Sequence, residues 1–250
     1  MSFAPDSKCV NEVRPAVNFG ERRDGTAIEI LLLHYTGMNG ALAALDWLCC
    51  EESGVSCHYF IDEEGHITQL VGEEKRAHHA GAGFWDGRDD INSRSIGIEI
   101  VNDGHPGGLP PFPQAQMDSV LRLSKDIIAR HSIEAHLVLA HSDTAPSRKQ
   151  DPGEKFDWAW LAERGVGHFV IPSPIVSGRY FQQGDKGLPV EALQLMLTQY
   201  GYGVPVNGTF DDATRMVVTA FQRHFRQEKV DGVADMSTID TLHRLLKAIP

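Results

Sequence analysis

The sequence predicts an α/β domain followed by a small unit of three helices. Short apolar runs alternate with amphipathic helical stretches up to about residue 165, which is typical of a sheet flanked by helices. Residues 165–180 then hold three glycines and two prolines without periodicity, as expected of a linker. Beyond it, three stretches carry apolar residues at helical intervals. We therefore divide the chain into a domain at 1–165, a linker at 166–180 and a helical unit at 181–250.

The composition excludes some classes of partner. With 42% hydrophobic residues, a chain of 250 residues has enough apolar side chains for a packed core. Its formal net charge of −11 at pH 7 argues against binding to nucleic acid or to an anionic membrane by bulk electrostatics, because both would be repelled. The four cysteines lack the paired spacing of a zinc ribbon, and we expect free thiols.

The N-terminal stretch shows no targeting signal. It lacks the charged segment and apolar run of a secretory signal, and nowhere do about 18 apolar residues follow one another. We therefore expect a cytoplasmic protein without a membrane segment. Residues 1–27 are polar and broken by Pro5, Pro15 and Gly20, so they are expected to wrap over the surface before the first strand.

Periodicity and turn residues define the remaining elements. Apolar residues at every third or fourth position predict helices, and short branched apolar runs predict strands. The expected strands are 28–35, 58–61, 67–71, 95–101 and 137–139, and the expected helices are 40–51, 114–131, 156–164, 190–200, 211–225 and 237–246. Residues 76–83 hold too many glycines and alanines for a stable strand, so we expect a loop whose backbone another molecule can approach.

Two histidines and an aspartate have the pattern of a metal site. His34 and His141 each follow a short apolar run, so each is expected where a strand ends and is held rigidly toward a cleft. Asp151 follows His141 by ten residues, in a loop stiffened by Pro146 and Pro152. Two imidazoles and one carboxylate suit one Zn²⁺ ion and leave a fourth position for water, as in catalytic zinc sites.

Glu99 and Lys149 are the candidate catalytic residues. Glu99 is the single carboxylate in an otherwise apolar strand. Burial would raise its pKa toward neutrality and suit it to take a proton from a metal-bound water. The alternative is an acid that faces solvent on an edge strand. Lys149 is either a solvated loop lysine or a cation that reaches a developing oxyanion.

The remaining histidines give weaker signals. His58 alternates with apolar neighbours on a strand, and we interpret it as a hydrogen-bonded core residue rather than a ligand. Seven others resemble surface or helix residues and receive no role: His66, His105, His131, His136, His168, His224 and His243.

Five motifs of the first domain together resemble a known family. They are Leu33–Thr36 (LHYT), Val55–Ile61 (VSCHYFI), Arg76–Gly81 (RAHHAG), Asn92–Glu99 (NSRSIGIE) and Ala140–Gly153 (AHSDTAPSRKQDPG). Through them the chain resembles the zinc-dependent N-acetylmuramoyl-L-alanine amidases of the AmpD and AmiD type. The resemblance implies a mixed central sheet flanked by helices, as in peptidoglycan recognition proteins.

The resemblance also implies roles for individual residues. It makes His34, His141 and Asp151 the zinc ligands. Glu99 becomes the general base, and Lys149 stabilises the tetrahedral intermediate. Three further residues become candidate contacts to the muramyl peptide: His79, Asn92 and Arg76. The implied reaction is hydrolysis of the amide between N-acetylmuramic acid, or its 1,6-anhydro form, and L-alanine, in cell-wall turnover or recycling.

The chain departs from the family pattern at three positions. His78 stands where many relatives have tryptophan. Cys57 stands where phage-type relatives have a catalytic tyrosine, which agrees with the bacterial branch. Asp90 stands where some cytoplasmic members have arginine, so their preference for one substrate form is in doubt here.

The last unit resembles the three-helix peptidoglycan-binding domain of many wall hydrolases. The motifs that carry the likeness are Gly184–Gly187, Val190–Leu197, Tyr200–Tyr202, Val206–Phe210, Phe221–Gln222 and Val230–Gly232. Its expected role is to hold the enzyme on polymer, so the expected partners are peptidoglycan or muropeptides, and contact with the periplasm or cell wall is compatible with it. Two alternatives stay open: a non-catalytic peptidoglycan receptor and a phage-type endolysin.

Overall fold

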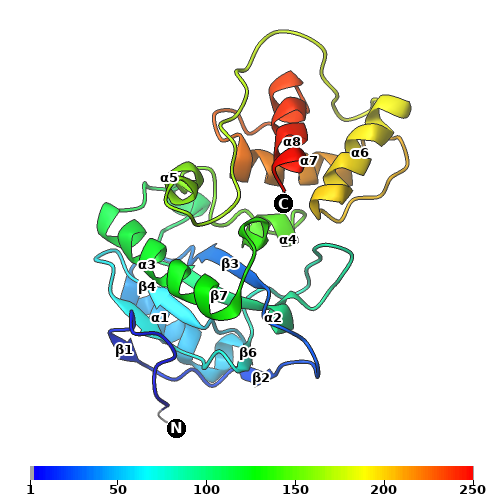
Figure 1. The fold of residues 1–250 in the computed structure, drawn as a ribbon. Coiled ribbons are helices and arrows are strands. Elements are labelled where there is room, and N and C mark those ends of the chain that lie inside the picture. The colour runs from blue at the N-terminus through cyan, green and yellow to red at the C-terminus, as the bar shows by residue number, and fades with distance from the viewer. Residues whose placement is uncertain (1–2, 250) are drawn as a thin grey trace.

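A six-stranded sheet forms the centre of the N-terminal part of the chain (Figure 1). The structure, a computed structural model, describes residues 3–249, so residues 1 and 2 of the expected wrap and residue 250 of the expected helical unit lie outside the described residues. The strand order is β1-β5-β4-β7-β3-β8, and every neighbouring pair is parallel except β4 and β5. This mixed sheet flanked by helices confirms the predicted fold class.

The elements largely follow the predicted order. The strands are β1 Glu12–Val13, β2 Phe19–Glu21, β3 Ile30–Tyr35, β4 Tyr59–Ile61, β5 Ile67–Gln69, β6 Lys75–Ala77, β7 Ser95–Ile100 and β8 Val138–Ala140. The α-helices are α1 Ala41–Cys49, α2 Ile91–Arg94, α3 Gln114–His131, α4 His141–Thr144, α5 Trp158–Glu163, α6 Leu188–Tyr200, α7 Asp212–Phe225 and α8 Met236–Ala248. Short 3₁₀ turns lie at Glu51–Ser53, His105–Gly107 and Ala135–Leu137. Among the described residues, no helix is both long and apolar enough to cross a bilayer.

The two faces of the sheet are covered by different helices. Strand side chains alternate between faces, and Leu31 and Leu33 of β3 pack with residues of α3 and α5. Ile30 and Leu32 point the other way and pack with residues of α6, α7 and α8. His34 continues this second row, so it lies on the face opposite α3. The strands at the centre are buried on both faces, which explains their nearly continuous apolar runs.

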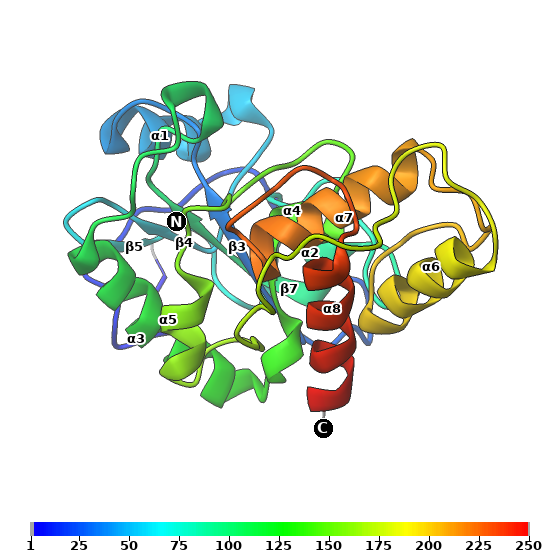
Figure 2. The same cartoon turned by 90° about the horizontal axis from the view of Figure 1, so that it is seen from above.

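The helices α6, α7 and α8, called the helical unit below, share one apolar core with the sheet. Trp85 and Leu139 lie in the same cluster of buried side chains as Leu193 and Phe221. The ring centroids of Trp85 and Tyr202 are 4.8 Å apart. Figures 1 and 2 both show the helical unit beside α4, which contacts α7. The two parts of the chain are therefore packed together, although the segment between them has no regular structure from residue 167 to 180.

The sequence prediction misses several short elements. The expected N-terminal wrap contributes β1, which pairs with β5 at the edge of the sheet, and β2, which pairs with β6. β6 occupies the start of the segment expected as a loop at 76–83. Residue 141 begins the short helix α4 rather than a loop. Strands of two or three residues are too short to show an alternating pattern, and their hydrogen bonds come from partners distant in sequence.

A buried carboxylate ties α3 to the sheet and gives a first prediction. Glu73 accepts hydrogen bonds from Tyr59 and Arg130, and His131 Nε2 lies 2.6 Å from its Oε2. Burial raises the pKa of Glu73, but these partners outweigh it and lower the pKa from 4.5 to about 2. Ionised Glu73 therefore contributes stability above pH 4.5, and that contribution is lost as the pH falls toward 2.

Replacing Glu73 by glutamine is accordingly expected to lower the free energy of unfolding at pH 7 by about 2 kcal/mol, after allowance for the partly exposed Arg130. Urea denaturation between pH 7 and 3 measures this, and the variant should lose less stability with falling pH than the parent. Glu74→Gln, an exposed neighbour, is the control. Equal acid sensitivity of parent and Glu73→Gln would contradict the assignment.

Candidate active site

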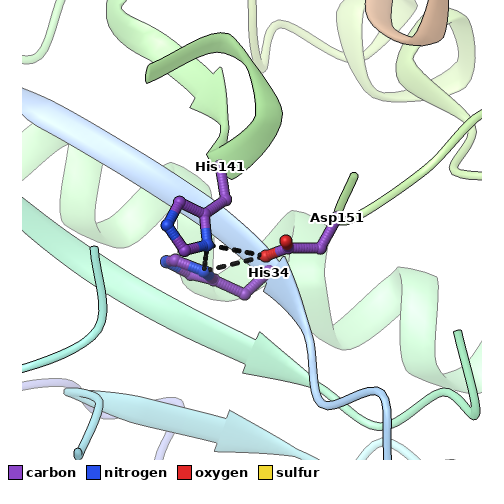
Figure 3. Close-up of side chains that lie close together, drawn as sticks. All are labelled: His34, His141 and Asp151. Atoms are coloured by element: carbon purple, nitrogen blue, oxygen red, sulfur yellow. Dashed lines mark hydrogen bonds and ion pairs between the residues drawn. The ribbon is translucent and has the colours of Figure 1, made fainter. Parts of the chain in front are cut away.

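Three side chains converge at the ends of two neighbouring strands (Figure 3). His34 lies near the end of β3, His141 directly follows β8, and Asp151 comes from the loop after α4. His34 Nδ1 lies 2.9 Å from His141 Nδ1 and 3.1 Å from Asp151 Oδ2. His141 Nδ1 lies 2.9 Å from the same oxygen. All three residues are buried, so the structure brings together the three residues that the sequence singles out.

The hydrogen bond of the outer nitrogen of each imidazole shows which ring nitrogen has a lone pair free to bind a cation. His141 Nε2 lies 2.9 Å from the carbonyl oxygen of Ala80. A carbonyl only accepts, so Nε2 carries the proton and Nδ1 presents a lone pair to the centre. Burial and the neighbouring His141 lower the pKa of His34 to about 4, which keeps its ring neutral at physiological pH.

A chain of hydrogen bonds fixes the tautomer of His34 in the same way. The Ser95 hydroxyl donates to the carbonyl oxygen of Ile91 at 2.7 Å, so its oxygen accepts from His79 Nε2 at 3.3 Å. His79 Nδ1 is then an acceptor, and His34 Nε2 donates to it at 3.0 Å. Gly97 makes room for this relay, because a Cβ there would lie 2.5 Å from the His79 ring.

These assignments allow a test of whether the three residues fit a metal ion. Two nitrogen lone pairs and a carboxylate oxygen face one another at about 3 Å, with no proton left to lie between the two nitrogens. Three electron-rich atoms at this spacing repel one another unless a cation lies between them. The donor set therefore fits a metal ion.

Glu99 lies beside this centre on the neighbouring strand. It pairs in register with His34 across β7 and β3, and its Oε1 is 4.0 Å from His34 Nδ1. β7 is a central strand and the side chain is 14% exposed, so the alternative of an edge-strand acid in solvent is wrong. Burial, and secondarily Asp151, raises the pKa of Glu99 well above its usual value. Its buried Oε2 has no hydrogen-bond partner among the described residues.

A cleft of about 350 Å³ opens onto these side chains. Glu99, Lys149 and His79 line it together with His141 and Asp151. Tyr35, Trp47 and Leu48 add apolar surface on the wall next to α1. The cleft therefore combines a buried metal-type site, a carboxylate with high proton affinity and a cation within one concave surface.

The three expected substrate contacts do not all border the cleft. Only His79 lines it. Asn92 is buried instead, and its Oδ1 accepts the backbone N–H groups of His79 and Ala80. Its amide thereby fixes the loop that carries His79. Arg76 pairs with Asp90 at 2.9 Å and lines a different surface hollow. The structure thus places Asn92 and Arg76 outside the cleft lining, since nearness in sequence to cleft residues does not decide where a side chain points, and their contact with substrate stays a prediction.

The departures from the family pattern have distinct places. His78 lines the cleft, whereas Cys57 is fully buried and lies outside its lining. Burial raises the pKa of the Cys57 thiol well above its usual value. All four cysteines are free, as predicted. His58 is buried, and its Nδ1 accepts the backbone N–H of Gly97, in agreement with its interpretation as a core residue.

Sequence reasoning missed a buried cluster behind His141. Asp143 accepts hydrogen bonds from Tyr202 at 2.6 Å and from the backbone N–H of Ala140 at 2.8 Å. His224 Nδ1 lies 2.7 Å from the same carboxylate, and its ring stacks on Trp158 with centroids 3.8 Å apart. His224, assigned no role above, therefore links the helical unit to the turn that carries His141. Its place on the apolar stripe of α7, three residues after Phe221, was the available signal.

Comparisons with known proteins identify the family of the chain. Residues 24–154 match the family model described as N-acetylmuramoyl-L-alanine amidase, and residues 186–242 match the model described as a putative peptidoglycan binding domain. The chain is 36% identical to the N-acetylmuramoyl-L-alanine amidase AmiD of Escherichia coli, with 88% of this chain and 83% of the relative covered. It is also 36% identical to the 1,6-anhydro-N-acetylmuramyl-L-alanine amidase AmpD of Enterobacter cloacae, over 42% of this chain and 54% of that relative.

Solved structures give the same picture. The E. coli AmiD structure in complex with its substrate superposes with a TM-score of 0.74 at 34% identity, covering 92% of this chain and 97% of that one. AmpDh3 from Pseudomonas aeruginosa, in complex with anhydromuramic pentapeptide, gives a TM-score of 0.72 at 30% identity, covering 95% and 96%. The chain belongs to the N-acetylmuramoyl-L-alanine amidase family.

Proposed function

We propose that this chain hydrolyses the amide bond between N-acetylmuramic acid, or its 1,6-anhydro form, and L-alanine in peptidoglycan or muropeptides, in cell-wall turnover or recycling. The substrate in the related AmiD complex is anhydro-N-acetylmuramic acid-L-Ala-D-γ-Glu-L-Lys, and AmpDh3 was solved with an anhydromuramic pentapeptide. The observation that carries the proposal is the convergence of His34, His141 and Asp151 beside the unpartnered carboxylate of Glu99. A receptor that had lost a ligand would lack this set.

The metal in this proposal is one zinc ion held by His34 Nδ1, His141 Nδ1 and Asp151. Two imidazoles and one carboxylate are a common donor set for catalytic zinc. When bound, zinc supplies a Lewis acid that polarises the scissile carbonyl and lowers the pKa of the attacking water. The protein residues contribute fixed tautomers, through Ala80 and His79, that keep both lone pairs aimed at the same point.

In the proposed mechanism, Glu99 transfers the proton and Lys149 stabilises the oxyanion. The high pKa of Glu99 suits its carboxylate to accept the proton of the attacking water and to return it to the departing amine nitrogen. Lys149 lines the same cleft, where its ammonium stabilises the negative charge that develops on the carbonyl oxygen. Trp47 and Leu48 add apolar surface to the cleft on the α1 side.

The experiment that tests the function uses the purified full chain with a defined metal content. Incubation with the anhydro-muropeptide and with intact sacculi, followed by mass spectrometry, should show a free peptide that begins with L-alanine. Removal of metal with a chelator should abolish product formation, and one equivalent of Zn²⁺ should restore it. A metal-loaded protein that releases no peptide from either substrate would overturn the proposal in favour of a receptor.

We also propose that residues 1–165 act as the catalytic domain and residues 181–250 as a peptidoglycan-binding domain, joined through 166–180. The match of residues 186–242 to a peptidoglycan-binding model supports the second assignment. Binding of polymer by this domain would raise the local concentration of scissile bonds at the cleft.

The relay behind His34 gives a further prediction. Replacing His79 by phenylalanine keeps an aromatic ring but removes the acceptor for His34 Nε2. The ligand ring then loses its fixed tautomer, and zinc affinity is expected to fall by roughly 10- to 100-fold. Competition with a chromophoric chelator measures the dissociation constant without turnover.

His78→Phe is the matched control for His79→Phe, since His78 also lines the cleft but has no part in the relay. Its zinc affinity should match that of the parent. Ser95→Ala, which removes only the last hydroxyl of the relay, should weaken zinc binding less than His79→Phe. Unchanged affinity in His79→Phe would show that the orientation of His34 does not depend on the relay.

A further inference from the structure

A second, basic hollow adjoins the cleft at the seam between the two parts of the chain. It has a volume of about 230 Å³ and lies between the segment 146–150 and α7. Four of its lining residues are cationic: Arg148, Lys149, Arg215 and Arg223. No aspartate or glutamate is among the described residues that line it. In a protein with a formal net charge of −11, such a gathering of positive charge is unexpected on composition alone.

The charges in this hollow are only weakly compensated. Arg148 donates to the backbone carbonyls of Ala80 and Ala82, which carry no net charge. Arg215 lies 3.4 Å from Asp212 in an exposed pair, and surface pairs of this kind contribute little. Arg223 Nε lies 3.6 Å from Glu154, a distance too long for a hydrogen bond, and has no hydrogen-bond partner among the described residues. Arg215 and Arg223 therefore keep donor capacity for an anion in the hollow, whereas the Arg148 guanidinium is directed to the 80–82 loop.

The position of the hollow indicates which anion it receives. Lys149 lines both the hollow and the catalytic cleft, so the two meet at this residue. A ligand bound at the metal-type site therefore extends into the hollow if it reaches past Lys149. The opposite wall comes from α7 of the helical unit, through Arg215 and Arg223.

We propose that this hollow is a subsite for the carboxylates of the stem peptide. The inference rests on the proposed function and deepens it. In a peptide of the type L-Ala-D-γ-Glu-L-Lys, the γ-linkage leaves the α-carboxylate of glutamate free, and the last residue adds a second carboxylate. Guanidinium groups bind carboxylates with two parallel hydrogen bonds. The helical unit thus contributes residues to substrate selection as well as to polymer binding.

The test compares Arg215→Ala with the parent on two muropeptides. One has free carboxylates, and in the other the glutamate α-carboxylate and the terminal carboxylate are amidated. We expect the parent to prefer the free acid in kcat/KM, and Arg215→Ala to lose roughly fivefold on the acid while changing little on the amide. Arg215→Glu should reverse the preference. Lys247→Ala, which removes one exposed charge from α8 outside the hollow, should behave as the parent.

A binding measurement separates this inference from the proposed function. Calorimetry of the full chain with the peptide L-Ala-D-γ-Glu-L-Lys requires no turnover. We expect binding that weakens with added salt and weakens about fivefold in Arg215→Ala. A protein without amidase activity that still binds the peptide in this way would overturn only the proposed function. Equal effects of Arg215→Ala and Lys247→Ala, or equal use of acid and amide by the parent, would overturn the subsite.

Discussion

Replacing Glu99 by glutamine is expected to lower kcat by roughly 10²- to 10⁴-fold. Glutamine keeps the size of the side chain but cannot accept the proton of the attacking water. The environment of Glu99 suits a proton acceptor. Burial raises the pKa of Glu99, and one of its carboxylate oxygens has no hydrogen-bond partner among the described residues. Release of peptide from a muropeptide, followed by chromatography, measures the loss.

The same variant should keep its metal. Glu99 Oε1 lies 4.0 Å from His34 Nδ1, whereas Asp151 Oδ2 lies at 3.1 Å from it, so Glu99 is not among the converging ligand atoms. Zinc content by mass spectrometry should therefore match that of the parent. Glu64→Gln, at an exposed turn, controls for loss of a negative charge. If Glu99→Gln retained its turnover, the proton acceptor would have to be another group.

Replacing His224 by alanine is expected to lower the free energy of unfolding by about 3–5 kcal/mol. The change removes a partner of the fully buried Asp143 carboxylate. It also removes a ring stacked between Trp158 and Phe225, with centroid distances of 3.8 and 3.7 Å. Both interactions lie where the helical unit meets the turn that holds His141. We therefore expect the stability of the whole chain to fall, and not that of the helical unit alone.

Urea denaturation of the metal-free protein measures this effect without a contribution from bound zinc. His243→Ala, an exposed histidine of α8, is the matched control and should change the stability little. Tyr202→Phe removes one hydroxyl that donates to Asp143 and should cost about 1.5–3 kcal/mol. A loss below about 1 kcal/mol in His224→Ala would show that Asp143 does not depend on the helical unit.

The sequence predicts the metal-type site because its logic is local. His34 and His141 follow apolar runs that become the neighbouring parallel strands β3 and β8, and parallel strands bring their ends to the same edge of a sheet. Glu99 is recognisable as the one acid in a buried strand. Each of these signals needs only a few consecutive residues and the alternation of side chains along a strand.

The contacts between distant segments were beyond such reasoning. Asp143 contacts Tyr202 and His224, which lie 59 and 81 residues away in the sequence. The periodicity of apolar residues predicts a helix but does not predict which face of the sheet it covers. Asn92 and Arg76 show the same limit, since both lie near the cleft loop in sequence but point elsewhere. Only the packing of Ile30 and Leu32 shows that the helical unit covers the second face of the sheet.

The core shared by the sheet and the helical unit fixes the position of that unit relative to the cleft. A catalytic domain joined to its binding domain by a flexible linker would sample many positions and would hydrolyse any susceptible amide within reach. In the proposed function, a peptidoglycan-binding helical unit packed on this core would hold the polymer at a constant offset from the amide bond that is hydrolysed. We therefore expect the peptides removed from long glycan strands to be spaced in register with the anchor, and only strands of compatible helical pitch to be stripped efficiently.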